Sequence, residues 1–266
     1  MSIAGTGSVQ AGWRPFAAGA AVGVFGGLVG LGGAEFRLPL LLMFGLAVLP
    51  AVIVNKAISL VVVISALVFR SAAVAPLEVA AQWPVVVNLL LGSLAGAWLA
   101  AGWATRWRGK TLQRVIAVLL ALIAGALLLG HEPGGSAPAL QGIALRLTGV
   151  ALGFAIGVVA SLLGVAGGEL LIPTLVLLFG IELKLAGSVS LAISLPTMLA
   201  GFVRYSRDRS FEVLHTHRGF VLAMAAGSLA GAAAGGLLLG AVPSAVLLPV
   251  LAAILLVSAA KTWLHP

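Results

Sequence analysis

Long apolar segments follow one another along almost the whole chain, and only short charged or Gly/Pro-rich breaks separate them. A soluble surface needs many charged residues, whereas here 61% of the residues are hydrophobic and only 8% are charged. We therefore predict an all-α polytopic membrane protein with about 8–10 transmembrane segments, at roughly 20 residues per span. The apolar segments lie near residues 15–30, 36–47, 51–69, 83–103, 113–130, 146–165, 170–181, 186–203, 218–240 and 244–263.

Composition and missing motifs exclude several classes of function. The chain has no cysteine, which excludes disulfides and thiolate metal sites, and it contains no Walker-type phosphate loop, GxSxG elbow or HExxH zinc motif. We therefore expect no enzymatic activity, no cofactor and no metal, and we interpret His215 and His217 as solvated loop residues. The net charge of +8 comes from basic residues beside apolar segments, where they anchor membrane helices, so we expect no nucleic-acid partner.

An internal repeat divides the chain into two halves. The Gly-rich first parts align with an offset of 134 residues, so that Gly19 matches Gly153 and Pro39 matches Pro173. One extra residue then changes the offset to 135, and the six residues 92–97 are identical to residues 227–232. We predict one integral transmembrane domain, made of an N-terminal tail (1–13), repeat 1 (14–130), a linker (131–145) and repeat 2 (146–263).

The distribution of basic residues indicates that the two repeats have inverted topology. The loop 106–114 is basic and its counterpart in repeat 2 is uncharged, whereas the loop 204–218 is basic and its counterpart, 70–83, is not. Basic loops stay in the cytoplasm, so equivalent loops then lie on opposite sides of the membrane and both termini are cytoplasmic. The first residues lack the basic region of a cleavable signal peptide. We therefore expect a multi-pass protein of the cell (inner) membrane with a retained N-terminus.

Each repeat contains a Gly-rich break before an apolar segment too short to span the bilayer, residues 36–47 and 170–181. We predict that each segment is a re-entrant element or a half-helix, with Pro39 and Pro173 in the first turns. Glycine lets the backbone approach a ligand, and a helix N-terminus attracts anions. The alternative is that these small residues only pack helices together. The residues of the breaks that we predict to bind substrate are Gly32, Gly33, Gly167 and Gly168.

Ionisable side chains inside apolar segments are costly and are therefore candidates for function. Lys56 supplies a fixed positive charge for an anionic substrate, unless it pairs with Glu35 or extends to the membrane interface. Glu35 and Glu169 occupy equivalent positions beside the two breaks, where they either carry a coupling proton or cap the short helices. Arg37 either pairs with Glu35 or faces the substrate.

Short polar residues follow in the segment after each short helix, Asn55 and Ser59 in repeat 1 and Ser190 and Ser194 in repeat 2. Ser190 and Ser194 share one helix face because they are four residues apart. We predict that all four line the substrate site. The alternative for the hydroxyl groups is a hydrogen bond to their own helix one turn earlier.

The two Gly-rich breaks, each followed by a proline, resemble the signatures of the TauE/SafE sulfite exporter family. The resemblance covers nearly the whole chain and is carried by residues 26–39 and 164–173. Residues 54–56 resemble the family's Thr-Asn-Lys element with valine in place of the threonine, and Val189 departs from the family pattern in the same way.

This resemblance implies secondary active transport, as an exporter, of a small sulfur-containing anion such as sulfite or an organosulfonate. It also implies that Asn55 and Lys56 lie near the substrate. We expect proton coupling and alternating access at the interface of the repeats. The partners are then the substrate anion and the lipid bilayer, with a homodimer left open. Two alternatives are a cation transporter that uses Glu35 and Glu169 as ligands and an intramembrane lipid-pyrophosphate phosphatase.

Overall fold

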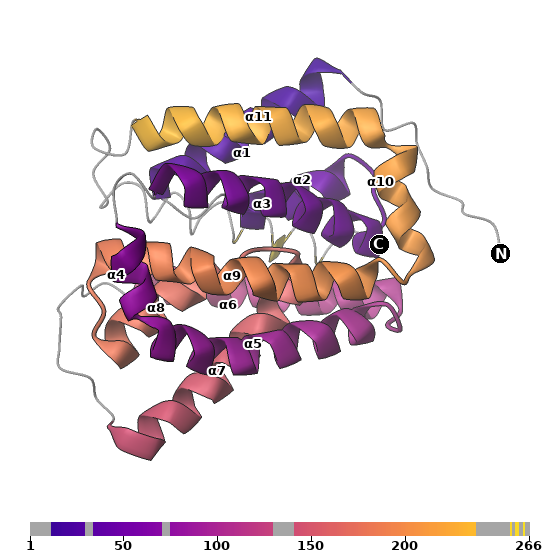
Figure 1. The fold of residues 1–266 in the computed structure, drawn as a ribbon. Coiled ribbons are helices and arrows are strands. Elements are labelled where there is room, and N and C mark those ends of the chain that lie inside the picture. The colour runs from indigo at the N-terminus through magenta and orange to yellow at the C-terminus, as the bar shows by residue number, and fades with distance from the viewer. Residues whose placement is uncertain are drawn as a thin grey trace.

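The computed structural model describes residues 12–29, 34–70, 75–129 and 141–237, together with residues 256, 259, 260 and 263. Every regular element in these ranges is helical (Figure 1). The elements are α1 (Trp13–Val29), α2 (Ala34–Met43), α3 (Val48–Arg70), α4 (Pro76–Ala81), α5 (Trp83–Ala104), α6 (Gly109–Leu129), α7 (Gly142–Leu163), α8 (Gly168–Phe179), α9 (Leu183–Tyr205), the 3-10 helix η1 (Arg209–Glu212), α10 (Val213–Thr216) and α11 (Arg218–Leu237).

The long helices lie where the apolar segments predict them. Among the described residues, the five helices α3, α5, α7, α9 and α11 are long and apolar enough to cross a membrane. By contrast, α2 and α8 have only 10 and 12 residues, too few for a span. The short helices α4, η1 and α10 lie in the polar connections, where the apolar pattern predicts nothing. Most of the last predicted segment, 244–263, falls outside the described part of the chain.

Both short helices begin earlier than predicted. Because α2 begins at Ala34 and α8 at Gly168, Pro39 and Pro173 lie inside the helices, so the expectation that they occupy the first turns is wrong. The start of α8 is explained by Gly167, its N-cap, which has a φ of +78° that glycine adopts without steric cost. A proline within a helix cannot donate to the carbonyl four residues earlier, and this weakens each short helix at that point.

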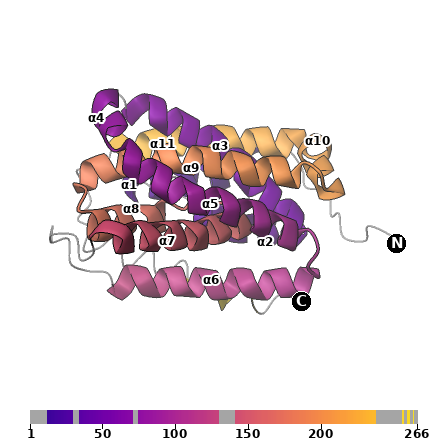
Figure 2. The ribbon, with the colours of Figure 1, turned by 60° about the horizontal axis from the view of Figure 1, so that its bottom comes forward.

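The helices pack in two groups, and each group contains helices from both halves of the sequence. In the first group, α1, α2 and α3 lie with α11 of the second half, at the top of Figure 1. In the second group, α7, α8 and α9 lie with α5 of the first half, and α6 runs along the edge of the bundle (Figure 2). Contacts between α3 and α9 join the two groups. The halves have therefore exchanged one long helix each.

Glycines bring the exchanged helices unusually close together. A Cβ on Gly92 of α5 would collide with the backbone of Val150 in α7, and a Cβ on Gly227 of α11 would collide with the backbone of Phe16 in α1. These contacts are equivalent, because 92 and 227 differ by 135 and 16 and 150 differ by 134. Close backbone contacts with the same correspondence occur at Gly19, Gly23, Gly96, Gly153, Gly157 and Gly231. The two halves therefore share these close helix crossings in addition to the glycines that form them.

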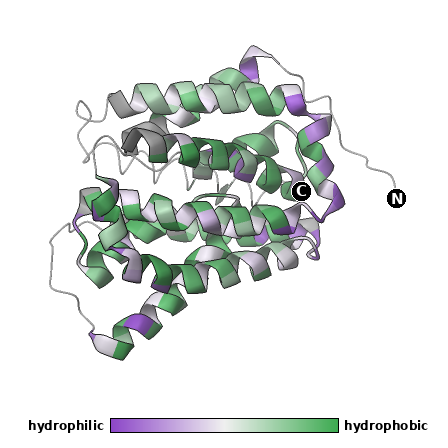
Figure 3. Ribbon diagram, in the orientation of Figure 1, coloured by the Kyte–Doolittle hydropathy of each residue, from purple (hydrophilic) through white to green (hydrophobic). Residues whose placement is uncertain are grey.

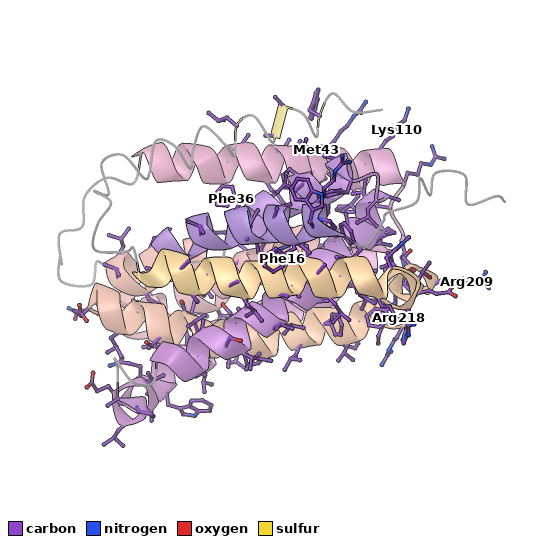
Figure 4. All side chains as sticks on the ribbon, turned by 90° about the horizontal axis from the view of Figure 1, so that it is seen from above. Phe16, Phe36, Met43, Lys110, Arg209 and Arg218 are labelled. Atoms are coloured by element: carbon purple, nitrogen blue, oxygen red, sulfur yellow. The ribbon has the colours of Figure 1, made fainter. Side chains whose placement is uncertain are left out.

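The two basic loops lie at the same end of the bundle. Figure 4 shows Lys110, in the first turn of α6, at the end that also carries Arg209 of η1 and Arg218, the first residue of α11. Along the rest of the helices hydrophobic residues dominate (Figure 3). Such a distribution is typical of membrane helices whose positively charged connections stay on one side.

Tryptophan side chains lie near the ends of the long helices. Trp13 and Trp83 are the first residues of α1 and α5, Trp103 is the last but one of α5, and all three are exposed. Trp98, one turn further into α5, packs under two arginines, with the guanidinium carbons of Arg204 and Arg207 at 5.4 and 5.2 Å from the ring centre. Exposed aromatic rings at helix ends are expected at a membrane interface.

Candidate functional site

The second Gly-rich break brings the end of α7 directly against α3. After Leu163, the last residue of α7, Gly164 adopts a φ of +71°, which side chains disfavour. A Cβ on Gly164 would collide with the carbonyl of Val52 and would lie 3.2 Å from the backbone nitrogen of Lys56. Glycine therefore allows the break to contact α3 at Val52 and Lys56, the second of which is predicted to bind substrate.

Arg37 of α2 is fully buried and holds two side chains of α3. Its Nη1 donates to Oδ1 of Asn55 over 3.2 Å and to Oγ of Ser59 over 3.0 Å. A buried guanidinium is costly unless its N–H groups are bonded, so these acceptors stabilise the cation inside the bundle. The side chain of Glu35, the partner that the sequence suggested for Arg37, lies outside the described residues.

Asn55 connects α3 to both breaks. Its Nδ2 donates to the carbonyl of Ala34, the first residue of α2, over 3.0 Å and to the carbonyl of Leu163 over 2.9 Å. Ala34 follows the first break and Leu163 precedes the second, so one amide group holds the two breaks on the same helix. Both the nitrogen and the oxygen of the Asn55 amide form hydrogen bonds, because Oδ1 also accepts from Arg37.

Lys56 does not belong to this network. It is 0% exposed, so it does not extend to the interface, and its Nζ has no hydrogen-bond partner within the described ranges. In α9, a Cβ on Gly201 would lie 2.9 Å from this Nζ and 2.9 Å from Oγ of Ser161 in α7. The Nζ of Lys56 therefore lies where α3, α7 and α9 meet. An uncompensated charge in apolar surroundings is costly, and an anion would compensate it.

The polar residues of the second half behave differently. Ser190 donates to the carbonyl of Gly187 in its own helix over 2.9 Å, as the alternative for the hydroxyl groups proposed. Ser194 is buried, and the described part of the chain offers its Oγ no hydrogen-bond partner. Thr197 donates to the carbonyl of its own helix and has its Oγ1 2.7 Å from Oγ of Ser93.

The structure thus brings part of the predicted set together. Arg37, Asn55 and Ser59 form one hydrogen-bonded group, and Lys56 lies beside it on α3. Gly167 and Gly168 are buried at the start of α8. Outside the described residues lie Gly32 and Gly33, and also the side chains of Glu35 and Glu169, whose backbones belong to α2 and α8. The described residues include no group of three or more His, Asp or Glu side chains that could hold a metal ion.

Sequence reasoning missed two residues beside Lys56, Ser161 and Gly201, and a third, Tyr205, that holds the backbone of Ser161. Ser161 and Gly201 lie inside apolar segments, where a lone serine or glycine follows no pattern that marks a site. Tyr205 is fully buried, and its hydroxyl donates to the carbonyl of Ser161 over 3.0 Å. The one available signal was Tyr205, the single tyrosine of the chain, which stands at the border of an apolar segment and a basic loop.

Comparison with known proteins gives one family. The family model described as sulfite exporter TauE/SafE matches residues 15–262, which include both Gly-rich breaks and both halves of the repeat. The resemblance inferred from the motifs is therefore confirmed. No curated protein and no solved structure matches the chain.

Proposed function

Because the chain belongs to the sulfite exporter TauE/SafE family, we propose that it is a secondary active transporter that exports a small sulfur-containing anion, such as sulfite or an organosulfonate. The chain is a multi-pass membrane protein. The proposal places it in the cell (inner) membrane with both termini in the cytoplasm, since the basic loops share one end of the bundle.

The observation that carries the proposal is the environment of Lys56. Its ammonium group is buried among helices of both halves and has no hydrogen-bond partner in the described chain. A bound anion would compensate this charge, whereas a cation would be repelled by it. A transporter must also release its cargo, and a protein carboxylate paired permanently with Lys56 would compete with the substrate. Asn55, Arg37 and Ser59 then shape the wall beside the anion, and Ser194 offers a further hydroxyl.

We propose that transport proceeds by alternating access between two inverted repeats, with α2 and α8 as half-helices. The equivalent crossings at Gly92 and Gly227 support a twofold relation between the halves. Lys56 lies where α3 of the first half faces α7 and α9 of the second. Movement of one half against the other would therefore change access to this charge.

Glu35 and Glu169 are the proposed carriers of the coupling proton. They occupy equivalent positions at the starts of the two short helices, next to the breaks that Asn55 holds on α3. A carboxylate there also complements the helix dipole, so capping and proton transfer are compatible roles.

Uptake into proteoliposomes tests the proposal. Sulfite and methanesulfonate are offered under an imposed pH gradient to wild type, Lys56→Ala, a Glu35→Gln/Glu169→Gln double variant and the control Lys110→Ala, whose side chain is exposed at the basic end. We expect saturable uptake that is stimulated by the gradient, is lost in Lys56→Ala and is retained in Lys110→Ala. The double variant should keep transport and lose its dependence on the gradient.

Two results would contradict the proposal. The first is the absence of flux for both anions although the reconstituted protein is folded. The second is cation transport that Lys56→Glu preserves or increases, which would favour the cation transporter.

A further inference from the structure

Two buried polar groups beside Gly201 have no hydrogen-bond partner among the described residues. The residues Lys56 and Ser161 are both 0% exposed, and neither Nζ nor Oγ finds a hydrogen-bond partner in the portion of the chain that the structure describes. They come from different halves, Lys56 from α3 and Ser161 from α7. Each lies 2.9 Å from the position of a Cβ on Gly201. Any side chain at residue 201 would therefore occupy the position next to both donors.

The repeat does not explain this pair of groups. Residue 191, equivalent to Lys56, is leucine, and residue 27, equivalent to Ser161, is glycine. The two polar groups are thus specific to one place in the molecule and are not copies retained from a duplicated pattern. A buried donor without an acceptor is destabilising, and a buried ammonium group more so. Their coincidence at one point indicates a ligand that accepts from both.

The backbone around Ser161 is held in place from the other side. The hydroxyl of Tyr205, the last residue of α9, donates to the Ser161 carbonyl over 3.0 Å. Gly164, three residues later, packs against α3 next to Lys56. The last turn of α7, which carries Ser161 next to Gly201, is therefore fixed relative to both α3 and α9.

We propose that Nζ of Lys56 and Oγ of Ser161 bind two different oxygens of the cargo's sulfite or sulfonate group, and that Gly201 keeps the space for this group open. The inference rests on the proposed function and names the subsite that recognises its charged end. Such a group carries three oxygens that share the negative charge, so an ammonium and a hydroxyl on separate helices can each donate to one of them. Sulfite and organosulfonates have this group in common.

Binding measurements with purified protein test the subsite. Sulfite and methanesulfonate are titrated into wild type, Ser161→Ala, Gly201→Ala and the matched control Ser228→Ala by calorimetry. Ser228 of α11 also has a buried hydroxyl without a hydrogen-bond partner among the described residues. It is a control because it lies at the crossing of α1 and α11 and not beside Gly201. We expect Ser161→Ala to raise Kd about tenfold, the effect of losing one hydrogen bond to a charged group. Gly201→Ala should raise Kd further, and Ser228→Ala should leave it unchanged.

Folding of the variants does not obscure the result. The atoms that a Cβ at residue 201 would meet are the ends of the Lys56 and Ser161 side chains, which can move aside, and Ser161→Ala removes a single oxygen. Wild-type binding together with unchanged affinity in Ser161→Ala would overturn the subsite and leave the transport proposal intact. An equal loss in Ser228→Ala would also overturn it. If wild type binds neither anion, the subsite and the proposed function both fail.

Discussion

The α2–α3 side and the α8–α9 side of the molecule share their backbone pattern and differ in charge. The first side buries two basic side chains, Arg37 and Lys56. At the equivalent positions, 134 and 135 residues later, the second side has Leu171 and Leu191. A duplicated frame therefore supplies the short helices twice, whereas the buried basic residues Arg37 and Lys56 have leucines as their equivalents. At this pair of positions, only the first half can attract an anion.

The same comparison accounts for one unpartnered hydroxyl in the second half. Ser59 accepts a hydrogen bond from Arg37. Its equivalent, Ser194, finds no partner among the described residues, and Leu171 stands where the arginine would be. Because leucine replaces the guanidinium here, no described residue bonds this buried hydroxyl, and a ligand or water can do so.

A second pair of equivalent hydroxyls, Ser93 and Ser228, also differs in hydrogen bonding, at a distance from the short helices. Ser93 of α5 lies 2.7 Å from Oγ1 of Thr197 in α9. Its equivalent, Ser228 of α11, has no hydrogen-bond partner in the described chain, and Val62 stands 135 residues before Thr197. The two halves share their close helix crossings and differ in these hydrogen bonds.

The shared crossings give the largest expected effects, and these effects should be equal in the two halves. Gly92→Ala and Gly227→Ala each place a methyl group against the backbone of the facing helix. Each should lower the free energy of unfolding by about 3 kcal/mol, since neither backbone can move aside locally. Equilibrium unfolding in mixed detergent micelles measures this, with Gly12→Ala, which has no atom within 4 Å of its Cβ, as the control. Destabilisation by one variant and not by the other would break the equivalence.

The next effect belongs to the charged side alone. Arg37→Leu copies the second half into the first and removes the donor to Asn55 and Ser59. We expect the free energy of unfolding to fall by about 2–3 kcal/mol, because two buried acceptors lose their partner, and we expect transport to be lost. The exposed Arg106→Leu should change neither quantity. A stable and active Arg37→Leu protein would show that the hydrogen-bonded group is dispensable.

A smaller contrast is expected between Asn55 and its equivalent, Ser190. Asn55→Ala leaves the carbonyls of Ala34 and Leu163 without a donor and should cost about 2 kcal/mol. Ser190→Ala removes only a bond within one helix turn and should cost less than about 0.5 kcal/mol. Both values come from the same unfolding experiment. Equal costs would mean that Asn55 does not hold the two breaks together.

The smallest contrast concerns the two hydroxyls at the helix crossings. Ser93→Ala should lower the free energy of unfolding by about 1 kcal/mol, because Thr197 loses a hydrogen-bonded neighbour. Ser228→Ala should have no cost, since it removes a hydroxyl that is unpartnered in the described structure. Val62→Thr sharpens the test: in that background Ser228→Ala should become destabilising.

Much of the fold could be predicted from sequence, because apolar segments and their charged or Gly-rich breaks fix where membrane helices begin and end. The starts of α2 and α8 could not, since the left-handed conformation of Gly167 that begins α8 is a property of the folded backbone. The distribution of basic residues predicted that the loops 106–114 and 204–218 lie on the same side of the membrane, and in the structure both lie at one end of the bundle.

The candidate site was harder to predict. Arg37, Asn55 and Lys56 stood out because polar groups in apolar segments are costly. The sequence did not indicate that Arg37 and Asn55 would form a hydrogen-bonded group without Lys56. The bond from Asn55 to Leu163, for example, joins residues 108 apart in sequence, and no local pattern encodes it. Ser161 and Gly201 gained meaning only from their position next to Lys56.

The exchange of long helices has a consequence for synthesis of the protein. α1 packs along α11, which leaves the ribosome roughly 200 residues later, so at about 5–20 residues per second α1 waits for some 10–40 s. Its closely packed glycine face is without a partner throughout that interval. The pair of α5 and α7 forms much sooner. A chain that stops early therefore presents an unpaired small-residue face in the bilayer, a surface by which membrane quality control could distinguish unfinished copies from complete ones.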